Sequence, residues 1–241
     1  AFNEDDAFRK AIHELTTGIA WYKKSFYLPK KWRNKKIFIE FEGVRQAAEI
    51  FINGKKIALH ENGVMAFGID ITPFVFFGKN LNTILMKTDN RWDYREKSTG
   101  TLFQWHDRNF NANYGGIIKN VYLHVTNKLY QTLPLYTFLK TTGIYIYAKN
   151  INISEKKAII YVESEIKNET GKDKFIHFEF LISEIDGRPK VKSNGKDLFI
   201  RKDEVIIAKD SVCVDSLEFW SWGYGYLYDI KTIIKEKNTI V

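Results

Sequence analysis

Hydrophobic and polar residues alternate one by one over much of the chain, which is the pattern of strands that bury one face. Residues 36–42 and 47–52 both alternate in this way. Asn53 and Gly54 follow the second run directly. Because both residue types tolerate positive φ, the pair predicts a two-residue hairpin of type I′ that returns into residues 55–60.

The same alternation predicts short strands along the rest of the chain, separated by turns rich in Gly, Asn and Asp. The further runs are 67–72, 82–88, 121–126, 143–151, 157–168, 174–187, 196–216 and 226–236. Helical signals are brief. Residues 7–15 fit a short helix, and Thr72-Pro73 predicts a single helical turn. Regular short strands without long helices indicate β-sandwiches, so we expect an all-β protein with one sandwich over residues 1–126 and a second over 127–241.

Composition narrows the classes of partner. The 241 residues carry a formal net charge of +8, but the lysines are scattered among acids and form no basic stripe. The sequence therefore predicts no nucleic-acid partner. No apolar run approaches the roughly 20 residues of a membrane span, so no membrane partner is expected. The single cysteine, Cys213, lies between valines and is expected to be a strand residue.

Four stretches together resemble the amino-terminal part of glycoside hydrolase family 2, which contains β-galactosidases, β-glucuronidases and β-mannosidases. The first has a Trp-Tyr pair followed by basic residues and a Phe; the second has Gly-Val, an Asn-Gly hairpin and Asp-x-Thr. The third has Tyr-Gly-Gly before a strand, and the fourth runs from a Trp to Tyr-Leu-Tyr. They occupy residues 18–29, 41–75, 113–125 and 220–234, in the order of the family.

The resemblance implies a jelly-roll, galactose-binding-like domain followed by an immunoglobulin-like domain. In that family a (β/α)8 barrel comes third and holds both catalytic glutamates. We therefore expect this chain to be an inactive amino-terminal fragment of a β-galactosidase-like enzyme that hydrolyses terminal β-linked sugars with retention. Its second sandwich would be cut near the last strand. The barrel would be its partner, packed against the run that contains Trp220 and Trp222.

Three properties are left open by the sequence. A free-standing carbohydrate-binding protein without hydrolase activity is the alternative function. Oligomeric state is open, with a homo-oligomer as one option. A bacterial periplasmic or secreted location is expected, with a cytoplasmic one as the alternative.

No catalytic residue is expected in this chain. Retaining glycosidases need two carboxyl groups about 5–5.5 Å apart, and the acid/base of the family follows an asparagine. The pairs Asn3-Glu4 and Asn168-Glu169 fall in a tail and in a turn. The acids of residues 40–42 and 163–165 alternate with apolar residues and predict a solvated sheet face. The histidines are dispersed, so neither a metal site nor a cofactor is predicted.

Two loops carry the residue types that bind sugars, because aromatic faces stack on C–H patches and planar polar groups pair with hydroxyls. These loops cover residues 89–100 and 104–114. The alternative is that their tryptophans pack the sandwich edge and their asparagines cap turns. The candidate substrate-binding residues are Trp92, Trp105, Asp107, Arg108, Asn109, Asn111 and Asn113.

The second loop departs from the family. In β-galactosidases and β-glucuronidases an aspartate shortly before the Gly-Ile strand reaches the active site of the barrel. Alignment on the Tyr-Gly-Gly-Ile segment places Phe110 there, so Asp107 or Asn111 would have to take that role. Gly115 and Gly116 are expected to allow a sharp turn or a close approach to a neighbouring segment.

Overall fold

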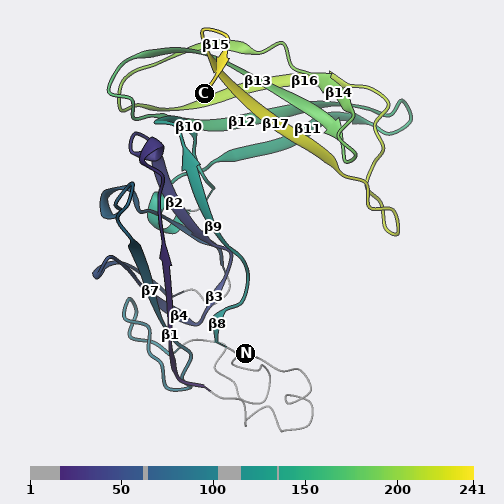
Figure 1. The fold of residues 1–241 in the computed structure, drawn as a ribbon. Coiled ribbons are helices and arrows are strands. Elements are labelled where there is room, and N and C mark those ends of the chain that lie inside the picture. Colours follow the sequence, from purple (N-terminus) through teal and green to yellow (C-terminus); the bar gives the residue numbers. More distant parts are fainter. Residues whose placement is uncertain (1–16, 62–64, 103–114, 135) are drawn as a thin grey trace. The chain divides into compact units, whose positions relative to one another are not determined.

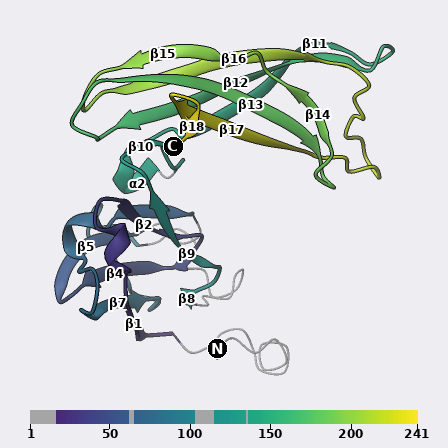
Figure 2. The same ribbon diagram turned by 45° about the horizontal axis from the view of Figure 1, so that its top comes forward.

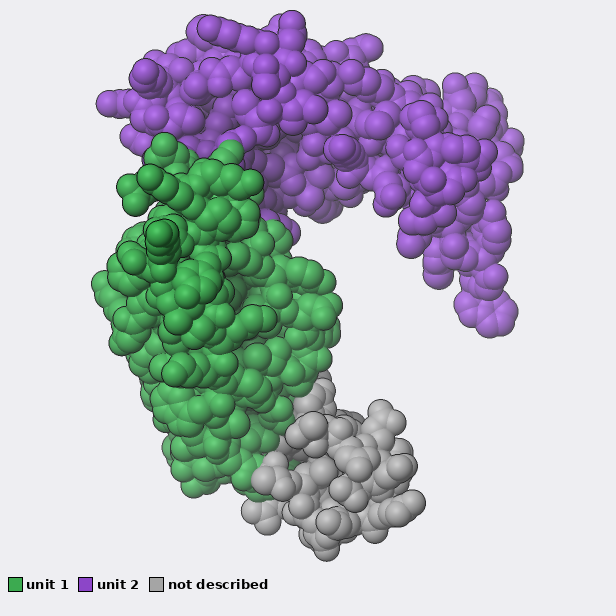
Figure 3. All heavy atoms as spheres, viewed as in Figure 1, with its two compact units in different colours: residues 1–125, 136–139 green, residues 126–135, 140–241 purple. Residues whose placement is uncertain are grey.

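Strands dominate the computed structural model (Figures 1 and 2), which describes residues 17–61, 65–102, 115–134 and 136–241. The predicted all-β class is therefore confirmed. The predicted helix over residues 7–15 lies outside the described residues. The chain divides into two compact units (Figure 3), with residues 1–125 and 136–139 in unit 1 and residues 126–135 and 140–241 in unit 2.

The described residues of unit 1 form three sheets. A four-stranded sheet has the order β1-β7-β4-β5, a three-stranded sheet has the order β6-β2-β9, and β3 pairs with β8. The strands are β1 (Ile19–Phe26), β2 (Lys36–Phe41), β3 (Val44–Arg45), β4 (Ala47–Ile52), β5 (Lys55–His60), β6 (Phe67–Asp70), β7 (Asn82–Asp89), β8 (Gly116–Ile117) and β9 (Val121–Thr126). The short helices are η2 (Lys30–Trp32), η3 (Thr72–Phe74) and α2 (Tyr136–Leu139).

The core of unit 1 is formed by the alternating apolar positions of these strands. Phe41 and Phe67 stack with ring centroids 4.9 Å apart, and the imidazole of His60 stacks on Phe67 at 3.9 Å. Ile37 and Ile50 are fully buried beside them. Removing this apolar surface from water is the main favourable contribution to folding of the unit.

The predicted hairpin between β4 and β5 is confirmed. Asn53 and Gly54 have φ values of 50° and 82°, as a type I′ turn requires, and Ile52 pairs with Lys55 across it. The Asn53 amide also donates to Asn82 Oδ1 at 3.0 Å, and its Oδ1 accepts from the Thr83 amide at 2.8 Å. Asn82 is fully buried and exchanges two hydrogen bonds with the backbone of Phe76. The turn is thus fixed to the start of β7.

The single helical turn predicted at Thr72-Pro73 is also present, as η3. Asp70 Oδ1 accepts a hydrogen bond of 2.9 Å from the Thr72 amide, and the Thr72 hydroxyl accepts one of 2.9 Å from the Ile37 amide. These contacts hold the turn against β2.

Unit 2 contains two sheets. In one, β12 pairs with β10, β11 and β16; in the other, the order is β14-β13-β17-β18 and β15 also pairs with β13. The strands are β10 (Leu129–Gln131), β11 (Ile144–Asn152), β12 (Lys157–Asn168), β13 (Lys174–Glu184), β14 (Pro189–Lys192), β15 (Lys196–Ile200), β16 (Val205–Val214), β17 (Tyr228–Glu236) and β18 (Thr239–Ile240). Phe178, Phe180, Val162 and Ile166 are fully buried in its core.

The prediction of a solvated acidic face on β12 is wrong for one residue. Glu165 is 8% exposed, and its carboxylate accepts hydrogen bonds of 2.8 Å from the hydroxyls of Thr132 and Thr142. Segments that precede β11 supply these donors. Alternation gives the face of a strand but not what covers that face, and a carboxylate with two donors can be buried without losing its hydrogen bonds.

Cys213 belongs to β16, as its neighbours predicted, and it is exposed. Among the described residues, no helix is long and apolar enough to cross a membrane.

Candidate carbohydrate-binding site

The structure describes the first of the two predicted sugar-facing loops. Residues 90–102 follow the end of β7 and are called here the Trp92 loop. Trp92 itself is half-buried within it. The remaining candidates lie outside the described residues, so their role stays a prediction: Trp105, Asp107, Arg108, Asn109, Asn111 and Asn113, together with Phe110.

A single carboxylate holds the middle of the Trp92 loop. Glu61, directly after β5, accepts hydrogen bonds from the Tyr94 hydroxyl at 2.5 Å and from the backbone amides of Lys97 and Ser98 at 2.6 and 3.1 Å. Burial raises the pKa of Glu61, but these donors outweigh burial and hold it below its ordinary value. Burial and the neighbouring Glu61 carboxylate together raise the pKa of Tyr94. The loop is therefore anchored by a charged acceptor with three donors.

The start of the loop is fixed by a second carboxylate. Arg91 donates from Nε and Nη2 to the two oxygens of Asp89 at 3.0 and 2.8 Å. The hydrogen bonding to Asp89 raises the pKa of the exposed Arg91 guanidinium. Asp89 is only 7% exposed, so the pair presents a guanidinium of defined orientation at the end of β7.

The outer face of the β1-β7-β4-β5 sheet lies under this loop. Antiparallel pairing places Lys87 of β7 next to Glu49 of β4, and Glu49 next to Leu59 of β5. One row further along, Asp89 pairs with Ala47. Because alternate residues share a face, these five side chains form a common floor.

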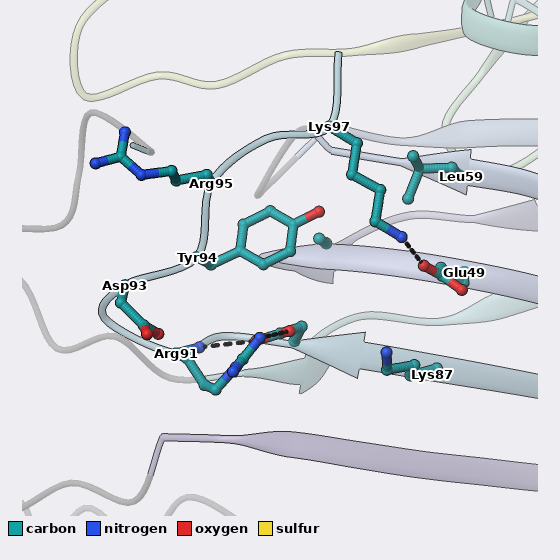
Figure 4. Close-up of a pocket in the computed structure, with 10 residues that line it drawn as sticks. Glu49, Leu59, Lys87, Arg91, Asp93, Tyr94, Arg95 and Lys97 are labelled. Atoms are coloured by element: carbon teal, nitrogen blue, oxygen red, sulfur yellow. Dashed lines mark hydrogen bonds and ion pairs between the residues drawn. The ribbon is translucent and has the colours of Figure 1, made fainter. Parts of the chain in front are cut away.

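Floor and loop together enclose a pocket of about 210 Å³, shown in Figure 4. The residues that the loop adds to the five of the floor are Arg91, Asp93, Tyr94, Arg95 and Lys97. In Figure 4, Lys97 extends from the loop toward Glu49, while Arg95 points away from the other labelled side chains. The Glu49 carboxylate also forms an ion pair of 3.2 Å with Lys56. The hydrogen bond from Lys97 is the main cause of the lowered pKa of Glu49.

Sequence reasoning placed the Trp92 loop but missed the row of side chains on the sheet face next to it. Trp21 of β1 was assigned only to a family motif, yet it is 59% exposed and pairs in register with Lys87. Its ring lies 6.1 Å from that of Phe51. Alternation indicated that Glu49 points outward, but the register that brings Trp21, Lys87 and Glu49 into one row depends on long-range pairing.

The two predicted loops are rooted side by side. A Cβ on Gly115, where the second loop returns, would lie 2.4 Å from Cγ of Asn90, where the first loop begins. A Cβ on Gly116 would lie 2.0 Å from the Tyr22 hydroxyl, and Gly116 has a φ of +90°. The close approach expected for these glycines is confirmed, because neither position has space for a side chain.

The Asn168-Glu169 pair and His124, which the sequence analysis also considered, take part in hydrogen bonds within the fold. Asn168 is fully buried and its amide donates to the carbonyls of Lys172 and Arg201 at 2.8 and 2.9 Å. Glu169 accepts a hydrogen bond of 2.7 Å from the Tyr130 hydroxyl. The imidazole of His124 lies 2.6 Å from the Glu40 carboxylate. Within the described part of the chain, no three His, Cys, Asp or Glu residues are grouped as metal ligands would be.

The architecture is thus that of a two-unit β protein with a polar pocket on an outer sheet face, and comparisons with known proteins agree with the two-unit β fold. The sequence model of "Glycosyl hydrolases family 2, sugar binding domain" matches residues 6–127, and that of "Glycosyl hydrolases family 2" matches residues 143–241. The chain belongs to glycoside hydrolase family 2.

Individual relatives give the same assignment. The chain is 37% identical over its whole length to a β-glucuronidase of Formosa agariphila, and 27% identical over 90% of its length to a β-galactosidase of Thermoanaerobacterium thermosulfurigenes. A solved structure of a family 2 β-glucuronidase superimposes with a TM-score of 0.86 at 36% identity, over 95% of this chain and 24% of that one. The chain spans about a quarter of the length of these two curated relatives (25% and 28%).

Proposed function

We propose that this chain is the non-catalytic, amino-terminal pair of domains of a retaining glycosidase that removes terminal β-linked sugars. The observation that carries the proposal is the succession of two family 2 matches along a chain that spans a quarter of its glycosidase relatives. In this proposal the two catalytic carboxyl groups belong to a barrel domain of the same protein. The two units described here pack against that domain and contribute to binding its substrate.

For the substrate we propose a β-glucuronide first and a β-galactoside, the sequence-based prediction, second. The support for this order is that the relative at 37% identity and the solved structure at 36% identity both carry the name β-glucuronidase. The support for the second substrate is the β-galactosidase relative at 27% identity.

We further propose that the run between β16 and β17 contacts the barrel. The side chains of Trp220 and Trp222 are 67% and 96% exposed, and Leu227 is 65% exposed. Grouped exposed aromatic residues are typical of contact surfaces, because their burial in a complex removes apolar area from water. Substitution of Trp222 by Ser should leave this chain stable but reduce the stability of the full-length protein.

The test compares the 241-residue chain with the full-length protein. Hydrolysis of 4-nitrophenyl β-D-glucuronide and 4-nitrophenyl β-D-galactoside is followed by release of nitrophenolate. Full-length protein is expected to release it, faster from the glucuronide, and the 241-residue chain is expected to release none above background. Turnover by the 241-residue chain at an enzymatic rate would contradict the proposal. A faster rate with the galactoside would reverse the proposed order of substrates.

A free-standing carbohydrate-binding protein is the second candidate function. The polar pocket beside an exposed indole on unit 1 favours it, since such a pocket needs no barrel to bind a sugar. A full-length protein that binds glycans but hydrolyses neither nitrophenyl glycoside would support this alternative.

A further inference from the structure

The pocket under the Trp92 loop has an excess of positive charge at one end. Two lysines line it beside one carboxylate: Lys97 forms an ion pair with Glu49, and Lys87 is the neighbour of Glu49 on the next strand. Lys56, which is outside the lining, also forms an ion pair with Glu49. Among the described residues no carboxylate forms an ion pair with Lys87. This end of the pocket therefore offers an ammonium group to an anionic ligand.

The other charged residues of the lining are two arginines, Arg91 and Arg95, and two aspartates, Asp89 and Asp93. Arg91 is satisfied by Asp89, and the exposed Asp93 lies close enough to contribute to the raised pKa of the Arg91 guanidinium. No ion pair of Asp93 is found within the part of the chain that the structure describes. Asp93 can thus accept hydrogen bonds from hydroxyl groups of a ligand.

An aromatic surface adjoins the cationic end. Trp21 does not line the pocket, but it pairs in register with Lys87 on the neighbouring strand, and neighbouring strands lie about 4.8 Å apart. Its exposed indole offers a flat apolar face of the kind that stacks on the C–H side of a sugar ring. The pocket volume of about 210 Å³ is below the ~300–1,000 Å³ of pockets for drug-sized molecules and suits a single sugar unit.

We propose that this pocket binds a hexuronic acid residue. The sugar carboxylate would pair with Lys87, its hydroxyls would donate to Asp93, and its ring face would stack on Trp21. The proposal deepens the proposed function, because it rests on the chain being part of a protein that acts on β-linked sugars. The hydrogen bonds from the Trp92 loop to Glu61, called here the Glu61 clamp, hold the pocket wall in place before the ligand binds. This reduces the conformational entropy lost on binding.

The test is a titration of the ¹⁵N-labelled 241-residue chain by NMR. The probes are methyl β-D-glucuronide and methyl β-D-glucoside, which differ only in the carboxylate. The indole signal of Trp21 is identified by its loss in Trp21→Phe. We expect the glucuronide to shift this signal in a saturable way, with at least tenfold weaker binding of the glucoside. Raising the salt concentration should weaken the binding of the glucuronide but not that of the glucoside.

Two variants and two matched controls locate the site. Trp21→Ala and Lys87→Met should each weaken glucuronide binding about tenfold or more. Tyr27→Ala and Lys24→Met, which change exposed residues outside the pocket, should leave glucuronide binding unchanged. Circular dichroism confirms that each variant is folded, and Lys87→Met provides the test if Trp21→Ala does not fold.

Several outcomes would overturn the proposal: equal binding of both glycosides, no saturable shift of the Trp21 signal, or full binding by Lys87→Met. Sodium acetate is titrated as well, and an equal effect of acetate would show a simple anion site without sugar recognition. Because this experiment needs no barrel, its failure is distinguishable from failure of the hydrolysis test. An active full-length enzyme, together with a 241-residue chain that gives no shift, would refute only the proposed hexuronic acid site.

Discussion

The Tyr94 hydroxyl donates a hydrogen bond of 2.5 Å to the carboxylate of Glu61, residues separated by 33 positions in sequence. This contact joins the middle of the Trp92 loop to the end of β5. The same carboxylate accepts hydrogen bonds from two backbone amides of the loop, so one side chain determines the position of the pocket wall. A carboxylate with several donors is hard to replace, because each alternative leaves a donor without its acceptor.

Substitution of Glu61 by Gln tests this role. The amide has one acceptor oxygen and presents an NH₂ group toward donors, so at least one loop amide loses its partner. The free energy of unfolding should fall by about 1–3 kcal/mol. Tyr94→Phe removes only the hydroxyl donor and should have a smaller effect. Chemical denaturation measures both, and an unchanged midpoint in Glu61→Gln would contradict the clamp.

The clamp should also depend on pH. The folded-state pKa of Glu61 is lowered, so its contribution to stability is complete above its unfolded pKa, near 4.5, and is lost as pH falls through the folded value. The difference in unfolding free energy between wild type and Glu61→Gln should therefore be constant near neutral pH and shrink in acid. Denaturant titrations at several pH values measure it. A difference that grows in acid would show that the sign is wrong.

Gly116 should not tolerate a side chain. A Cβ there would overlap the Tyr22 hydroxyl, and the φ of +90° is itself unfavourable for L-residues by about 1–2 kcal/mol. We expect Gly116→Ala to lower the melting temperature clearly, whereas Gly18→Ala, with nothing near its Cβ, should have a much smaller effect.

A second substitution separates the two causes. Tyr22→Phe removes the hydroxyl that a Cβ at position 116 would meet, so it should recover part of the stability of Gly116→Ala. The backbone cost should remain. Complete additivity of the two substitutions in a double-mutant cycle would contradict the overlap.

The hairpin turn depends on Asn82 as much as on its own residues. Asn82 is fully buried, accepts from the Asn53 amide and from the Phe76 backbone amide, and donates to the Phe76 carbonyl. Asn82→Ala leaves these groups without partners and should cost about 1–3 kcal/mol or more. Asn82→Asp keeps the acceptor oxygen. Its cost in stability should be smaller at low pH, where the protonated carboxyl can donate a hydrogen bond to the Phe76 carbonyl. Thermal unfolding of both variants measures the difference.

Local sequence patterns were sufficient for much of the fold. Asn53-Gly54 predicted its hairpin because a type I′ turn needs two residues that accept positive φ. Thr72-Pro73 predicted its helical turn for an equally local reason. Alternation failed at Glu165, since two threonine hydroxyls from segments before β11 cover it. The acceptor capacity of a carboxylate is visible in the sequence, but the donors that reach it are not.

The sequence by itself determined the all-β class, the turn positions and the resemblance to glycoside hydrolase family 2, because turn chemistry and strand periodicity are properties of neighbouring residues. Only the tertiary structure decided that Trp21, Lys87 and Glu49 share one row of a sheet and that Glu61 fastens the loop above them. These relationships depend on the register of strands far apart in the chain, and register is set by the packing of the whole sandwich.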